Sequence, residues 1–127
     1  MNKFCLFICF FFLFVIGNSD AQLLTNNNVS ITLTSSAQIT VKGTVQNNAG
    51  TVISNSGTID LSGDWVNNAA SSIFGTSAGT VILNGNGQNI SGTSSTIFNN
   101  LRLQGSGVKT LQVSTSAGGG YPSPSGV

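Results

Sequence analysis

The sequence contains no histidine and no glutamate, and charged residues make up only 6% of its 127 residues. Without His, a Ser or Thr nucleophile lacks its usual general base, and imidazole metal ligands are excluded. The formal net charge of +1 creates no field that would attract nucleic acid or an anionic membrane. We therefore predict no catalytic, cofactor-binding or metal-binding residues and no nucleic-acid partner.

Cysteine and membrane-spanning length are lacking as well. Cys5 and Cys9 are the only cysteines, and both lie within the apolar run 4–16, so the rest of the chain can form neither disulfides nor thiolate metal sites. As a helix, this run would reach about 20 Å, short of the roughly 30 Å hydrocarbon layer.

The N-terminal segment, residues 1–21, has the pattern of a secretory signal peptide. Lys3 precedes the apolar run, and the small residues Ser19 and Ala21 follow it. This arrangement predicts cleavage between Ala21 and Gln22, secretion or display at the outer cell surface, and no stable membrane span after cleavage. An uncleaved membrane anchor is the alternative.

What the chain does have is a repeated apolar triplet. Its four copies begin at positions 39, 59, 81 and 101, and they read Ile39-Thr40-Val41, Ile59-Asp60-Leu61, Val81-Ile82-Leu83 and Leu101-Arg102-Leu103. A nearly constant period of this length is typical of stacked repeats. In the segment 58–61, apolar and polar residues alternate with the period of a β-strand.

Each row of about twenty residues holds three such strand-like pieces separated by Gly, Asn or Ser. The sequence therefore predicts an all-β protein, a parallel β-solenoid (β-helix) of about four coils of about 20–22 residues, over residues 22–113. A single coil cannot bury enough apolar surface to fold alone, so the coils must stack.

Paired asparagines mark one position in the rows. Asn47-Asn48 holds the same place in its row as Asn67-Asn68 in the next, and Asn27-Asn28 falls one row earlier still. Asn tolerates the left-handed backbone conformation of tight corners, and stacked Asn side chains can form hydrogen-bonded ladders. The functional alternative is a polar strip that binds sugar.

Aromatic residues are the second place to look for a sugar site. Trp65 occupies the row position of Val45, which favours burial in the core over an exposed stacking platform. Phe74 and Phe98 lie in apolar pieces and are also expected in the core.

The carboxylates after Ala21 are Asp60 and Asp64. Strand alternation directs Asp60 outward, and Asp64 lies at a turn. They could share a calcium ion, but calcium prefers more oxygen ligands, so solvated surface acids are the favoured interpretation.

The end of the chain changes character. Leu111-Gln112-Val113 looks like the start of another coil, whereas residues 114–127 are rich in Gly, Ser and Pro and are predicted to be a tail or truncated linker. We expect that further repeats or a C-terminal domain are missing.

The repeats resemble those of a known group of proteins. The pattern comprises Gly63-x-Trp65-x-Asn67-Asn68, Ala78-Gly79-Thr80-Val81-x-Leu83-Asn84-Gly85, Gln88-x-Ile90-x-Gly92 and Thr96-x-Phe98-x-Asn100-Leu101-x-Leu103. It is similar to the Asn/Gly-rich repeat of large secreted surface proteins of gliding-type Gram-negative bacteria. The resemblance implies an adhesin-like, filamentous-haemagglutinin-like β-solenoid. The chain departs from that pattern in its few repeats and in having no sorting domain.

These observations favour a non-catalytic structural or adhesive module of a bacterial surface protein, with surface glycans or other cell-surface proteins as partners. A fragment of a secreted β-helix polysaccharide-degrading enzyme or a carbohydrate-binding module is the alternative, although the scarcity of acids argues against catalysis. Ice binding is a third reading, because Thr32 and Thr34 share one face, but neighbouring rows do not extend a flat Thr array.

Overall fold

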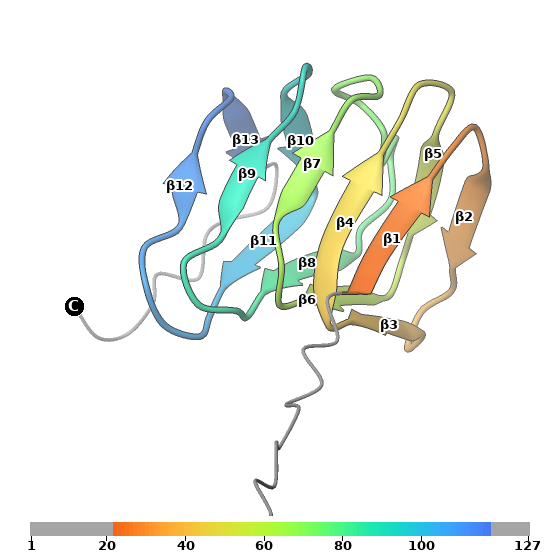
Figure 1. Cartoon of the computed structure of the whole chain (residues 1–127). Helices are drawn as coiled ribbons and strands as arrows, with labels where there is room; N and C mark the ends of the chain where they lie inside the picture. Colours follow the sequence, from red (N-terminus) through yellow and green to blue (C-terminus); the bar gives the residue numbers. More distant parts are fainter. Residues whose placement is uncertain (1–21, 118–127) are drawn as a thin grey trace, which may run out of the picture.

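The computed structural model describes residues 22–117, which form thirteen strands and no helix. The strands lie on three faces that wrap around one core (Figure 1). The predicted signal peptide, residues 1–21, and the last part of the predicted tail, 118–127, lie outside the described residues.

All strand pairs on these faces are parallel. Sheet A consists of β1 (Gln22–Asn26), β4 (Gly43–Asn47), β7 (Trp65–Asn67), β9 (Asn89–Ser91) and β12 (Thr110–Leu111). Face B holds two pairs, β2 (Ser30–Leu33) with β5 (Val52–Asn55) and β10 (Thr96–Phe98) with β13 (Thr115–Ala117). Sheet C consists of β3 (Gln38–Val41), β6 (Thr58–Leu61), β8 (Thr80–Leu83) and β11 (Asn100–Leu103).

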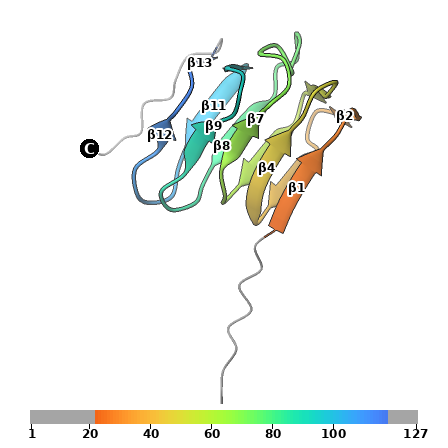
Figure 2. The same cartoon turned by 45° about the horizontal axis from the view of Figure 1, so that its top comes forward.

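The chain visits A, B and C in turn and then begins the next coil, so each coil lies on the one before (Figure 2). The four apolar triplets lie side by side in sheet C. Ile59 pairs with Ile39 and with Val81, and Leu101 pairs with Val81. The prediction of a parallel β-solenoid is therefore confirmed, and the repeat period read from the triplets is its coil length on this sheet.

A fifth coil begins after the four that the triplets predict, and the structure describes its first two strands, β12 and β13. Leu111 pairs with Ile90 in sheet A, as expected for the start of another coil. β13 then pairs with β10, so strand structure reaches Ala117, beyond the predicted end of the repeats at Val113. None of Thr115, Ser116 and Ala117 has a large apolar side chain, so the sequence pattern did not predict a strand there.

One coil is longer than the sequence predicts. Val45 pairs with Trp65, as the period of the triplets requires, but Trp65 pairs with Ile90, well past the position that the same period would give. The additional residues lie in turns at 71–76, on face B, and at 85–87, between sheets C and A. Both turns use left-handed glycines, Gly75 at φ 55° and Gly87 at φ 61°, so the extra length is taken up by turns and the strand register is preserved.

The core is a set of inward columns in which equivalent residues of successive coils stack. Its widest part is an aromatic cluster, in which the Trp65 ring lies 5.5 Å from Phe74 and 5.4 Å from Phe98, centroid to centroid. Trp65 and Phe98 are fully buried, and the Trp65 indole N–H donates to Thr96 Oγ1 at 3.0 Å. The expectation that Trp65, Phe74 and Phe98 belong to the core is confirmed.

Glycine is required where the chain turns from sheet C into sheet A. Gly63 lies directly over Gly43, and its N–H donates to the Gly43 carbonyl at 2.8 Å. A Cβ atom at Gly63 would lie 2.2 Å from the Gly43 carbonyl carbon. Because this neighbour is a backbone atom, no side-chain movement can relieve the overlap. Close coil stacking at this corner therefore depends on a residue without a side chain.

Replacing a central column residue should destabilise the whole stack. Leu61 is fully buried between Val41 and Leu83, so we expect Leu61→Ala to lower the free energy of unfolding by about 2–5 kcal/mol, because it removes apolar contacts and leaves a cavity. Urea unfolding followed by Trp65 fluorescence measures this. Val52→Ala, at an outward position that is 53% exposed, is the control and should cost less than about 1 kcal/mol. Equal losses would contradict the assignment of the columns.

Candidate functional site

The corner between sheet A and face B carries two columns of amide side chains. Alternation along β1, β4 and β7 directs Asn26, Asn47 and Asn67 inward, and they are 4%, 0% and 0% exposed. The residues that follow them, Asn27, Asn48 and Asn68, form an outer column that is exposed or half-buried. In each pair, therefore, one asparagine is buried and the next lies at the surface.

The register of the first pair differs from the prediction. Asn26 pairs with Asn47 in the strand ladder, so Asn26-Asn27 and not Asn27-Asn28 lies under Asn47-Asn48. The first coil is therefore slightly longer at this point than the second, in which Asn47 pairs with Asn67. Three consecutive asparagines, 26–28, leave the alignment of the sequence rows ambiguous here.

The outer column forms a hydrogen-bonded ladder, as predicted. The Asn48 amide donates to Asn27 Oδ1, and the Asn68 amide donates to Asn48 Oδ1 at 3.3 Å. Gln46 Nε2 also donates to Asn48 Oδ1, at 3.1 Å. The top of the ladder accepts the Thr93 N–H at Asn68 Oδ1, at 3.1 Å. We call Asn27, Asn48, Asn68 and Gln46 the outer amide ladder.

The other role expected of the paired asparagines, a left-handed backbone at the corner, is confirmed at Asn28 but not in the two later pairs. The left-handed backbone positions of this corner belong to Asn28, Gly50 and Gly92, with φ of 53°, 79° and 120°. None of Asn47, Asn48, Asn67 and Asn68 has a positive φ. In the later pairs, Asn48, Asn67 and Asn68 use their side chains for hydrogen bonds, and Gly50 and Gly92 supply the left-handed turn positions.

The inner column divides into satisfied and unsatisfied amides. Asn67 Nδ2 donates to the carbonyls of Ser95 and Ala70, at 2.8 and 3.1 Å, and its Oδ1 accepts the Ala69 N–H at 3.0 Å. Within residues 22–117, neither amide atom of Asn26 or Asn47 has a hydrogen-bond partner. Such buried polar groups cost stability, so these two positions are candidates for a role other than stabilising the coil.

The outer surface of sheet A continues the polar character of the ladder. Its two outward rows contain Thr25, Gln46, Val66, Ser91 and Gln112, and Leu23, Thr44, Asp64, Asn89 and Thr110, so they are polar apart from Leu23 and Val66. Adjacent rows are cross-linked by Gln112 Nε2, which donates to Asn89 Oδ1 at 3.3 Å. Amides and hydroxyls of this kind can both donate to and accept from a hydroxyl-rich ligand.

The two carboxylates lie in different sheets. Asp64, directly before β7, accepts from the Asn89 N–H at 2.8 Å and from Asn89 Nδ2 at 3.2 Å, so its two oxygens link successive coils. Asp60 is half-buried on the outer side of sheet C between Thr40 and Ile82, and its Oδ1 has no hydrogen-bond partner within residues 22–117. Over the same residues, no three His, Cys, Asp or Glu side chains cluster as metal ligands.

A second polar cluster, at the corner between sheets C and A, was not anticipated from the sequence. Gln88 is 1% exposed, its Nε2 donates to the carbonyls of Leu61 and Gly63, and its Oε1 accepts from the Gly85 N–H at 2.7 Å. Lys109 Nζ, one coil later, donates to the same Oε1 at 2.8 Å, and burial lowers the pKa of this lysine. In the sequence, the only sign of this cluster was Gln88, a single polar residue at a position of the repeat that faces inward.

Comparisons with protein-family models, with curated proteins and with solved structures give no match to this chain. Among residues 22–117, no helix is long and apolar enough to span a membrane. Function must therefore be inferred from the surfaces just described.

Replacing an inner asparagine by leucine should have opposite effects on the free energy of unfolding, depending on whether its amide is hydrogen-bonded. Asn67→Leu leaves three backbone groups without partners, and we expect it to lower the free energy of unfolding by about 1–3 kcal/mol. Asn47→Leu replaces an unpartnered amide by an apolar group of similar size and should be neutral or stabilising. Urea unfolding of both variants is the measurement. A loss at Asn47 as large as that at Asn67 would mean that Asn47 is hydrogen-bonded after all.

Proposed function

We propose that this chain is a non-catalytic structural and adhesive module of a bacterial cell-surface protein. It is exported after cleavage between Ala21 and Gln22 and displayed at the cell surface or released. Its outer surface contacts surface glycans or proteins through many weak hydrogen bonds. The observation that carries the proposal is the stacking of coils in constant register, which aligns outward polar side chains such as Thr25, Gln46 and Ser91 in rows along sheet A.

Repetition of weak sites is what supports adhesion. A single neutral hydrogen bond contributes about 0.5–1.5 kcal/mol net, too little to hold a partner alone. Residues at regular spacing, such as Thr25, Gln46 and Ser91 on sheet A, allow several such contacts to form at once with an extended partner. Binding at linked sites raises overall affinity without any strong individual contact.

The arrangement of the acids supports a non-catalytic role. Hydrolysis of a glycosidic bond generally uses two carboxylates facing each other across the bond. Asp64 is occupied by two hydrogen bonds from Asn89, and Asp60 belongs to sheet C. The buried positions of Trp65, Phe74 and Phe98 favour hydrogen bonding over ring stacking as the mode of sugar contact.

The proposal predicts binding that depends on one face. The exported protein should bind glycans on an array or attach to cells, and Gln46→Ala with Gln112→Ala on sheet A should weaken binding roughly tenfold, because two hydrogen-bonding side chains are lost. The matched control is Gln38→Ala with Gln104→Ala on the side of sheet C, which should leave binding unchanged.

Three results would contradict it. Equal loss in the control pair would remove sheet A as the contact face. Absence of binding in every format would leave a passive spacer. Release of reducing sugar from a polysaccharide, abolished by Asp60→Asn, would establish an enzyme instead.

A further inference from the structure

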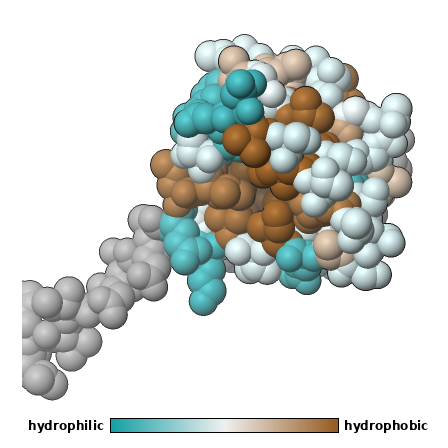
Figure 3. Space-filling view, turned by 90° about the vertical axis from the view of Figure 1, so that its right-hand side faces the viewer, coloured by the Kyte–Doolittle hydropathy of each residue, from teal (hydrophilic) through white to brown (hydrophobic). Residues whose placement is uncertain are grey.

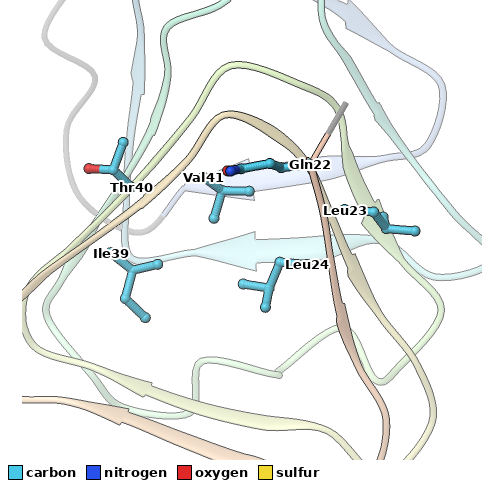
Figure 4. A pocket seen from close by; sticks show the side chains of 6 residues that line it. All are labelled: Gln22, Leu23, Leu24, Ile39, Thr40 and Val41. Atoms are coloured by element: carbon cyan, nitrogen blue, oxygen red, sulfur yellow. The ribbon is translucent and has the colours of Figure 1, made fainter. Parts of the chain in front are cut away.

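The solenoid has an open apolar end at its first coil. Figure 3 shows this end, where apolar side chains cover the middle of the face. A hollow of about 430 Å³ lies there, lined by residues of β1 and β3. In Figure 4, Leu24, Ile39 and Val41 point into the interior of the coil, whereas Leu23 points away from it.

The inward residues at this end belong to columns whose members in the second coil are buried. Val45, Ile53 and Ile59 in the second coil are 2–4% exposed. Their partners in the first coil, Leu24, Ile31 and Ile39, are only half-buried, because no coil within residues 22–117 covers them. The strands that carry them, β1, β2 and β3, are each paired on one side only, so their other edges leave N–H and C=O groups open to pairing.

We propose that a second copy of this chain covers this end, joined through the same end so that two solenoids form a two-fold symmetric dimer. The inference rests on the proposed export, because cleavage before Gln22 makes β1 the start of the chain. A two-fold axis through the centre of β1 would pass at Leu24, the middle residue of that strand. It would pair β1 with β1 and β2 with the partner's β3, all antiparallel.

The strands match under this symmetry. β2 and β3 are equal in length, and each alternates two outward polar residues with two inward aliphatic ones. Antiparallel pairing places Ile31 opposite the partner's Val41, and Leu33 opposite the partner's Ile39. The last coil offers no such match to β2, because the inward residues of β13 are Thr115 and Ala117.

The same arrangement fixes where the polar residues of the first coil would lie. Pairing about Leu24 places Asn26 opposite the partner's Gln22. Asn26 is 4% exposed and neither of its amide atoms has a hydrogen-bond partner within residues 22–117. Both amide atoms are buried within the first coil, and Gln22 Oε1 already accepts from the Lys42 N–H at 3.3 Å, so this pairing adds no hydrogen bond to the Asn26 amide. Lys42, the charged residue of this coil, would face the start of the partner's β2, away from the partner's Lys42.

The two ends of one column provide a matched test. Leu24 and Leu111 are the first and last residues of the column that contains Val45, Trp65 and Ile90. Sedimentation velocity of the exported protein should show a dimer, Leu24→Lys should convert it to a monomer, and Leu111→Lys should leave the dimer intact. Circular dichroism and Trp65 fluorescence confirm that each variant is folded.

Cross-linking tests the symmetry without disturbing the fold. The chain after Ala21 has no cysteine, so Leu24→Cys introduces one thiol beside the two-fold axis. Mild oxidation with oxidised glutathione should give a covalent dimer on a non-reducing gel, whereas Leu111→Cys should stay largely monomeric.

The other outcomes overturn the dimer or the proposed export separately. A monomeric wild-type protein that begins at Gln22 excludes the dimer while leaving export intact. A protein that keeps residues 1–21 contradicts the proposed export, and the oligomeric state of the chain starting at Gln22 then decides the dimer separately. Loss of association in both Lys variants would indicate head-to-tail stacking instead, and cross-linking through Leu111→Cys would indicate a two-fold contact at the opposite end.

Discussion

The contact of one coil with the next is the interaction on which this structure depends. The inward residues of a coil, such as Ile59 and Leu61, are sealed by equivalent residues of the coils on both sides. Each buried aliphatic side chain contributes about 1.5–3 kcal/mol. The few such side chains of one coil together contribute less than the cost of ordering the residues of that coil. Neither a single coil nor a surface ladder would persist without this stacking, and the end coils, which are covered on one side, are where the stack is open to a partner.

The spacing of aliphatic triplets was sufficient to predict the fold class and the register of sheet C. It was not sufficient to predict the longer interval between Trp65 and Ile90, because the added residues are the same Gly, Asn and Ser that make ordinary turns. The part played by Gln88 and Lys109 was also hidden. Their contacts join residues 21 to 27 positions apart in sequence, and no local pattern signals them.

The candidate site was predictable in kind but not in detail. Stacked asparagines indicated an amide ladder, and Asn48 and Asn68 form one. The division into an inner and an outer column follows from strand alternation, but a shift of one residue exchanges the two faces, and the run of three asparagines at 26–28 does not settle the register. The unpartnered amides of Asn26 and Asn47 could be found only once the register was known.

A surface built from repeated coils suits contacts that are individually weak and numerous, and both proposed interactions, of the polar face and of the apolar end, follow from the same stacking. The most direct test is the set of nuclear Overhauser effects between backbone protons of the aliphatic triplets in the isotope-labelled protein. The account predicts cross-strand contacts of parallel type between Ile59 and Val81 and between Val81 and Leu101. Antiparallel contacts, or triplets with no contact to one another, would contradict it.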